Sequence, residues 1–306
     1  MKKILSCILA ALLALSCLAL AACSGETDPG STNTPGGQQT PDGGESSTVD
    51  GLIDCYIEFS GTSYTTTDSS AIKVDGSALT IIKPGTYDLS GTLDNGQIIV
   101  EVTKADRVTL ILNNFTGHNE SSAVIWVKSA DKVYLEVKTG TTNTLTDGST
   151  YVFANPADTK PNACIYASDD LSIKGHGTLI VTGNYNNAIG CKNDLSINNC
   201  KLTVSAVNNA IKGNGSVTIK GEAEVLVEGA EDAIKSDSLN EGKGFVTVTE
   251  TAKVTVYCTD DALQATQNIT ITTGATVTTY AGGDSVNCDG IMTIDEGCLI
   301  ENAPEA

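Results

Sequence analysis

A four-residue segment recurs along the second half of the chain, and its spacing constrains the fold more than any other feature. It reads NNAI at 186–189 and at 208–211, EDAI at 231–234 and DDAL at 260–263. The last residues of the four copies, at positions 189, 211, 234 and 263, are 22, 23 and 29 residues apart. A period in this range is typical of a protein built from stacked repeats that contact only their neighbours.

A second series of short apolar segments follows the same period. These segments end at Ile173, Ile197, Ile219, Val248, Ile271 and Ile294, so the intervals are 24, 22, 29, 23 and 23 residues. Both series lengthen to 29 residues at the same repeat. The period therefore belongs to the architecture and does not arise from a biased composition.

The segment 208–229, NNAIKGNGSVTIKGEAEVLVEG, shows the content of one repeat. It predicts three short strands, near 210–212, 216–219 and 224–227, separated by corners that contain Gly and Asn. Alternation within the strands points Val217 and Ile219 to one side and Thr218 to the other. In the same way it separates Val225 and Val227 from Leu226. Three strands in about 23 residues predict a parallel β-helix of about ten coils. A β-sandwich remains the alternative, whereas a propeller would need a period near 40–50 residues.

The first 52 residues differ from the rest in composition. Lys2 and Lys3 precede an apolar run at 4–20, and the run ends in LAAC at 20–23, the pattern of a bacterial lipobox. We predict a lipoprotein signal peptide at 1–22 and a lipid on Cys23, which would anchor the protein to the extracellular face of the cell membrane. An ordinary secretory signal is the alternative. Residues 23–52 are rich in Gly, Ser, Thr and Pro and predict a flexible linker, followed by the β-helix domain at 53–306.

The charge of the chain limits its partners. Its formal net charge is −19, which opposes nucleic acid and anionic lipid and favours cations or neutral ligands. We expect a monomer that touches the membrane only through its lipid. Seven cysteines follow Cys23, an odd number without a CxxC motif, so a pair such as Cys191–Cys200 and buried free thiols are both open.

The repeated tetrad also predicts a metal site. Residues that recur once per coil stack in a column, which in this chain begins with asparagines and ends with acids. Asparagine side chains can hydrogen-bond along such a column, whereas carboxylates about 4.8 Å apart repel one another. A Ca²⁺ ion would relieve the repulsion, and turn residues exposed to solvent are the alternative. The candidate ligands are Glu231, Asp232, Asp260, Asp261 and Asp284.

Several motifs in order resemble a known family. They include TIIKPGTYDLSGTLDNGQIIVEV at 80–102, a segment at 121–148, DDLSIKGHGTLIVTG at 169–183 and the later repeats that contain EDAI and DDAL. They are similar to the secreted clostridial carbohydrate-binding β-helix proteins. The resemblance implies a right-handed, polysaccharide-lyase-like β-helix that binds calcium and plant-wall polysaccharides such as cellulose and pectic acid. The family's Asp-Asp-Ala/Gly-Ile turns match Asp232, Asp260 and Asp261, while the Asn-Asn turns depart from that pattern.

Two excursions break the period, and insertions in repeat proteins frequently lie on the binding side. Six extra residues fall inside 235–245, and a longer excursion falls at 139–162. The longer one carries Tyr151 and Phe153, which we predict to contact carbohydrate with their rings.

An enzyme is the main alternative to a binding protein. A calcium-dependent lyase acting on uronates needs a basic side chain, and Lys212 and Lys235 follow the tetrads directly. Beside carboxylates we expect both to be ordinary ammonium groups. A stacked acidic column also leaves an inverting hydrolase open. No catalytic residue is assigned, so we expect a non-catalytic binding protein, with a structural or adhesive surface stalk as the third alternative.

Overall fold

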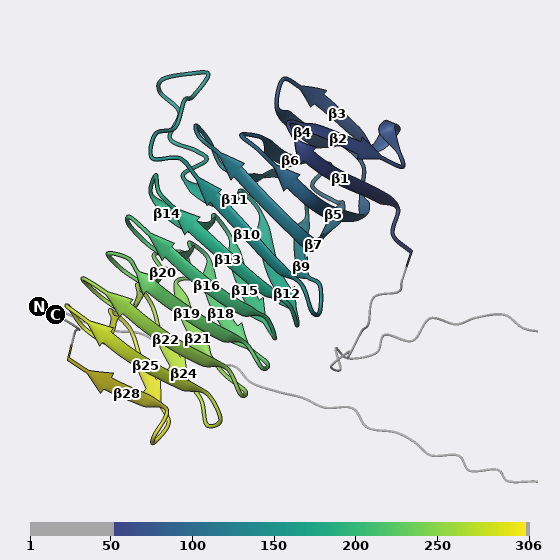
Figure 1. Ribbon diagram of the computed structural model, residues 1–306. Helices are drawn as coiled ribbons and strands as arrows, with labels where there is room; N and C mark the ends of the chain where they lie inside the picture. The colour runs from purple at the N-terminus through teal and green to yellow at the C-terminus, as the bar shows by residue number, and fades with distance from the viewer. Residues whose placement is uncertain (1–51, 304–306) are drawn as a thin grey trace, which may run out of the picture. The chain divides into compact units, whose positions relative to one another are not determined.

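The computed structural model describes residues 52–303, in which coils of β-strand stack around a continuous apolar core (Figure 1). One face of the stack is a ten-stranded sheet. Its strands, in stacking order, are β3 (Ile72–Asp75), β4 (Ala78–Ile81), β6 (Gln97–Glu101), β8 (Ile125–Ser129), β11 (Ala163–Ala167), β14 (Asn187–Cys191), β17 (Ile211–Gly213), β20 (Ile234–Ser236), β23 (Leu263–Ala265) and β26 (Val286–Cys288). From β4 to β26 every pair of neighbours is parallel.

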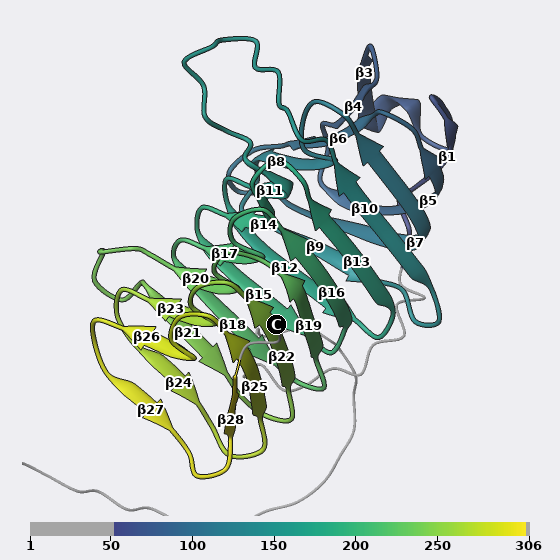
Figure 2. The same ribbon diagram turned by 60° about the vertical axis from the view of Figure 1, so that its left-hand side comes forward.

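An eighteen-stranded sheet covers the two other faces of the stack (Figure 2). The first of these faces contains β9 (Lys132–Val137), β12 (Asp170–Gly175), β15 (Asp194–Asn198), β18 (Ser216–Lys220), β21 (Phe245–Val248), β24 (Ile269–Ile271) and β27 (Met292–Ile294). The second contains β10 (Thr142–Asp147), β13 (Thr178–Gly183), β16 (Lys201–Ala206), β19 (Glu224–Gly229), β22 (Lys253–Cys258), β25 (Thr276–Ala281) and β28 (Leu299–Asn302).

The first coils are built differently from the later ones. Long strands β1 (Cys55–Gly61), β5 (Gly85–Leu93) and β7 (Arg107–Asn119) replace the separate strands of the two faces. β7 pairs with β9 along its first half and with β10 along its second half. The antiparallel hairpins β1–β2 (Ser63–Thr66) and β3–β4, joined by the short 3₁₀ helix Ser69–Ala71, end the stack at this side.

The coil architecture confirms the predicted parallel β-helix. Within residues 52–303, β8 to β28 form seven coils of three strands, and β4 to β7 form two coils of two strands. The strands expected near 216–219 and 224–227 are β18 and β19, and their burial alternates as the sequence predicts. The structure thus has nine coils, close to the number of about ten that the period predicts.

Aligned apolar side chains fill the interior and hold the coils in register. On the ten-stranded sheet, Ile189, Ile211, Ile234 and Leu263 lie directly above one another, and each is fully buried. Burying one such side chain contributes roughly 1.5–3 kcal/mol relative to leaving it exposed. A slip of one residue would turn these side chains outward, so the core fixes which residues reach the surface.

The structure corrects the bounds of the longer excursion. The stretch at 139–162 contains strand β10, whose inward Leu145 is fully buried, so the excursion is the loop at 148–162 between β10 and β11. The shorter one is the loop at 237–244 between β20 and β21. Both loops are therefore joined directly to strands of the ten-stranded sheet, and Figures 1 and 2 show the longer one projecting from the stack.

The seven cysteines of residues 52–303 are all free, and six of them are buried. Burial raises the pKa of Cys191 and of Cys200 to about 12, so neither thiol ionises readily near neutral pH. Of the two alternatives, buried free thiols hold for this structure. No helix among the described residues is long and apolar enough to cross a membrane.

Candidate metal centre and its surroundings

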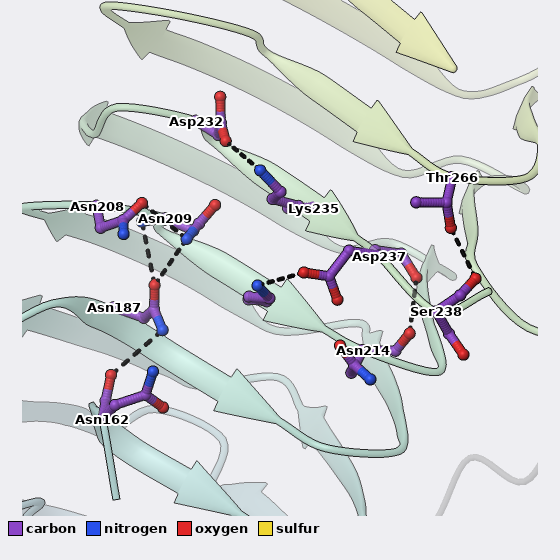
Figure 3. A network of polar contacts seen from close by, with 12 residues as sticks. Asn162, Asn187, Asn208, Asn209, Asn214, Asp232, Lys235, Asp237, Ser238 and Thr266 are labelled. Atoms are coloured by element: carbon purple, nitrogen blue, oxygen red, sulfur yellow. Dashed lines mark hydrogen bonds and ion pairs between the residues drawn. The ribbon is translucent and has the colours of Figure 1, made fainter. Parts of the chain in front are cut away.

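The second residue of each tetrad forms a column at the corner where the chain enters the ten-stranded sheet. Asn209 donates from Nδ2 to Oδ1 of Asn187 over 2.9 Å, and Asn187 donates from Nδ2 to the carbonyl oxygen of Asn162 over 3.2 Å (Figure 3). These bonds connect three successive coils through side-chain amides. The predicted amide ladder is thus present where the column consists of asparagine.

Carboxylates continue the column in the later coils. The backbone N–H of Asp261 donates to Oδ1 of Asp232 over 3.4 Å, and that of Asp284 donates to Oδ1 of Asp261 over 2.9 Å. Each carboxylate therefore accepts a hydrogen bond from the following coil. The corner geometry holds these side chains in line whether they are amides or acids.

Three of the five predicted metal ligands converge. Asp232, Asp260 and Asp261 each offer a carboxylate oxygen, and these oxygens all lie within 4.8 Å of one another. We call these three residues the acidic cluster. Asp232 and Asp261 are only 6% exposed, whereas Asp260 is exposed. Glu231 and Asp284 are exposed neighbours that do not belong to this group.

The acidic cluster concentrates negative charge at a partly buried corner of the coil. Two unit charges 4.8 Å apart repel by roughly 0.9 kcal/mol in water and by about 3.5 kcal/mol at an effective dielectric constant of about 20. The protein offsets part of this repulsion. Lys235 donates to Asp232 over 2.8 Å, while Gln264 and Asn287 donate to Oδ2 of Asp261 over 2.9 and 2.6 Å.

Two features favour a cation at the cluster. A Cβ atom at Gly283 would lie 2.6 Å from Oδ1 of Asp260 and 2.8 Å from Oδ1 of Asp261, so only a glycine lets these two carboxylates lie against the backbone of the next coil. On the preceding coil, Oδ1 of Asn209 is sealed from solvent and lacks a hydrogen-bond donor within residues 52–303. Figure 3 shows this amide below Asp232 and Lys235.

The donor set fits a hard divalent cation. Carboxylate and amide oxygens are the ligands that Ca²⁺ takes in proteins, and no thiol or imidazole belongs to the cluster. A Ca²⁺ ion bound there would be held by Asp232, Asp260 and Asp261. The ion would compete for Asp232 with the ammonium of Lys235, which the sequence places directly after the tetrad.

The aromatic residues of the longer loop have a different environment from the one expected. Tyr151 is only 8% exposed, its ring stacks on Tyr185 at a centroid distance of 4.1 Å, and its hydroxyl donates to Asp147 over 2.6 Å. Phe153 lies edge-on to Tyr185 at 6.5 Å and is half-buried. The contacts of Tyr151 hold the base of the loop, and they argue against the predicted role of its ring as a free platform for sugar.

Asp147 is the buried partner that organises this loop. It is 1% exposed and accepts hydrogen bonds from the hydroxyl of Tyr151 and from the backbone N–H of Asn184. Burial raises the pKa of Asp147, and the hydrogen bonds oppose that shift. Sequence reasoning missed this residue because it placed 147 inside an excursion and not at the end of a strand.

Other aromatic groups line two hollows on the outer surface. Tyr257 and Tyr280 stack at 4.5 Å on successive coils and line a cavity of about 560 Å³. On the ten-stranded sheet, Tyr166 lines a second cavity of about 360 Å³. The strand register brings these residues together, and register is what a reading of single motifs does not supply.

Known proteins resemble this chain over most of the described residues. A family model described as carbohydrate-binding domain-containing protein matches residues 75–297. A protein of the same description from Acetivibrio thermocellus is 38% identical over 192 residues, which are 63% of this chain and 62% of that protein, so this chain spans less than two thirds of its relative. A solved structure is described as the polysaccharide lyase-like protein from C. thermocellum, gadolinium derivative. It is 40% identical to this chain and superposes with a TM-score of 0.79, and the match covers 82% of this chain and 100% of the solved chain.

Proposed function

Because the chain belongs to the family of carbohydrate-binding domain-containing proteins, we propose that it is a cell-surface lipoprotein that binds polysaccharide through a calcium-containing β-helix. The acidic cluster is the observation that carries the calcium part of this proposal, since three carboxylates converge and two of them are 6% exposed. The ligand is a plant-wall-type polysaccharide, either cellulose or pectic acid.

Calcium would act as a bridge to an acidic polymer. The protein carries a formal net charge of −19, so pectate and protein repel overall, and a cation between them offsets this repulsion. Ca²⁺ accepts six to eight oxygen ligands, and the cluster supplies three carboxylates, one of them exposed. The remaining positions of the ion are available to a uronate carboxylate.

A neutral glycan would use a different surface. Cellulose carries no charge and is bound through contacts of sugar rings with aromatic side chains and through hydrogen bonds. The cavity lined by Tyr257 and Tyr280 supplies aromatic area on the eighteen-stranded sheet, and Phe153 supplies a half-buried ring on the longer loop. Such binding would need no calcium.

Ion pairs favour binding over lyase chemistry. A lyase needs an unprotonated base next to the proton that it removes. Lys235 is paired with Asp232 at 2.8 Å, and Lys212 is paired with Asp237 at 2.5 Å. Both candidate bases are therefore already engaged by a carboxylate of the protein, and we assign no catalytic residue.

The lipid anchor completes the proposal. Cys23 and the linker at 23–52 lie outside the described residues except for Leu52. The lipobox pattern supports attachment to the extracellular face of the bacterial membrane, with the domain as a monomer at the end of the linker.

Retention on insoluble polysaccharide tests the function. Purified protein is incubated with calcium pectate gel, cellulose and chitin, each with calcium or with excess EGTA, and the unbound fraction is measured. We expect binding to at least one plant-wall polymer, a marked fall in pectate retention in EGTA and no effect of EGTA on cellulose. Equal pectate retention in both buffers would disprove the bridge. Retention on none of the polymers would support a structural stalk, and ultraviolet-absorbing unsaturated product would support a lyase.

A further inference from the structure

The ten-stranded sheet carries a column of outward-facing residues, and one position in this column is a glycine. Strand register aligns Trp126 with Tyr166, Tyr166 with Gly190, and Gly190 with Lys212. A Cβ atom at Gly190 would lie 3.2 Å from Cδ2 of Tyr166 and 3.1 Å from Cβ of Ala163. Because Gly190 has no side chain, a cavity of about 360 Å³ opens beside Tyr166 and Lys212.

Three lysines line this cavity, which we call the lysine cavity: Lys160 from the longer loop, and Lys192 and Lys212 from the coils. The ammonium of Lys212 is paired with Asp237, whereas within residues 52–303 no carboxylate oxygen lies within 4.0 Å of Lys160 or Lys192. Two unpaired positive charges thus meet on a chain whose net charge is −19.

The surroundings of Lys160 favour an anion. Lys160 is exposed as a residue, but protein atoms around its ammonium and the nearby Lys212 lower its pKa, with Asp237 acting in the opposite direction. Its ammonium lies 5.3 Å from the ring centroid of Tyr166. A bound carboxylate would stabilise the ammonium of Lys160. It could also accept charge-assisted hydrogen bonds from Lys160 and Lys192, which are among the stronger ones in proteins.

Unused hydrogen-bonding groups line the same cavity. Tyr166 is 5% exposed, and its hydroxyl has no hydrogen-bond partner among the described residues. Burial raises the pKa of Tyr166 to about 12, so the hydroxyl keeps its proton at neutral pH. The side chains of Ser168 and Asn214 also line the cavity without a hydrogen bond to the described part of the chain. These groups suit a ligand that carries several hydroxyls beside its acid.

We propose that the lysine cavity binds a hexuronate residue of an acidic polysaccharide directly, with Lys160 and Lys192 on the carboxylate and no metal ion between them. Its volume lies within the range of about 300–1,000 Å³ found for small-molecule sites. This inference takes the acidic polysaccharide from the proposed function, but the mode of binding is different because no calcium ion takes part. The uronate of the calcium bridge and the uronate of this cavity are separate residues of the ligand.

The two sites lie on one line. Asn187 lines the lysine cavity and begins the corner column that reaches Asp232 and Asp261. Asn187 and Asp261 are three coils apart, which corresponds to about 14 Å at the usual strand spacing of about 4.8 Å. One acidic chain laid along the column would contact both sites, and the lysine cavity would hold it when calcium is removed.

Calorimetric titration with trigalacturonate in excess EGTA tests the proposal. Wild type is compared with Lys160→Gln/Lys192→Gln and with Gly190→Gln, which fills the cavity without changing its charge. Lys201→Gln/Lys253→Gln removes the same charge from the eighteen-stranded sheet and serves as the matched control. We expect both cavity variants to bind at least tenfold more weakly and the control to stay within twofold. Added salt and methyl esterification of the ligand should each weaken wild-type binding.

The other outcomes refute either the assignment of the cavity or the proposed function, and they are distinguishable. Cavity variants that bind as the control does, or a methyl ester that binds as the acid does, would exclude recognition of the carboxylate here. If the wild type does not bind trigalacturonate in EGTA but is retained on cellulose or on calcium pectate, the lysine cavity is not a uronate site and the proposed function stands. If it binds trigalacturonate but is retained on no polymer, the proposed function is wrong and the uronate site stands. Unchanged melting temperatures show that the variants are folded.

Discussion

Calcium should stabilise the later coils, and two substitutions should remove most of that effect. A ligand that binds only the folded state adds RT ln(1 + [L]/Kd), which is about 2.7 kcal/mol at a concentration of 100 times Kd. For a domain of roughly 250 residues, each kcal/mol moves the melting temperature by about 2–4 °C. We therefore expect a rise of about 5–11 °C between EGTA and saturating calcium.

The acidic cluster determines how Asp232→Asn/Asp261→Asn should behave. Each substitution removes one carboxylate from a group whose oxygens lie within 4.8 Å, so the calcium ligands fall from three charges to one. The variant also loses the Lys235 pair and places an amide donor against Gln264 and Asn287, so its melting temperature in EGTA is expected to change. The informative quantity is the increment caused by calcium, which should fall by more than half.

Melting followed by circular dichroism, in EGTA and in a series of calcium concentrations, measures this increment. Asp75→Asn, a substitution at an exposed residue of β3 far along the stack from the cluster, is the control and should keep the full increment. If chelator-treated wild type melts at the same temperature with and without millimolar calcium, the site does not exist. If the double variant keeps the increment, the ion binds elsewhere.

Further predictions concern the neighbours of the cluster, the longer loop and the anchor. Lys235→Gln removes the ammonium that shares Asp232, so calcium should bind more tightly in a titration of this variant, and weaker binding would show that Lys235 supports the site. Tyr151→Phe removes a hydrogen bond to the buried carboxyl of Asp147, which should cost about 1–3 kcal/mol and lower the melting temperature by several degrees without changing the calcium increment. An unaltered melting temperature would mean that this bond contributes nothing. Cys23→Ala should leave the protein unprocessed or released into the medium, as judged by fractionation and mass spectrometry. Normal processing and membrane retention of that variant would contradict lipidation.

Periodicity predicted the coils because a repeat must bury the same side chains in each layer. The strands expected near 216–219 and 224–227 appear as Ser216–Lys220 and Glu224–Gly229, with the predicted alternation of buried and exposed residues. The column of asparagines and aspartates likewise follows from the period alone. Both results need only local pattern and equal spacing.

Contacts between coils of unequal length could not be predicted in the same way. Strand β10, Thr142–Asp147, lies where the period fails, so the sequence alone assigns its buried Asp147, and the Tyr151 that bonds to it, to an excursion. The cavity at Gly190 depends on which side chains the register places on either side of a glycine, and on a loop that returns Lys160 to the same surface. Only the assembled structure supplies those neighbours.

A crystal structure of the protein with calcium and an oligogalacturonate, using the anomalous signal of the ion, tests most directly whether calcium on this β-helix binds the polysaccharide. We predict one Ca²⁺ held by Asp232, Asp260 and Asp261 at about 2.3–2.6 Å, with a uronate carboxylate completing its ligand sphere. An ion bound away from this cluster, or an oligosaccharide bound with no ion at the cluster under saturating calcium, would contradict the claim that calcium on this β-helix binds the polysaccharide.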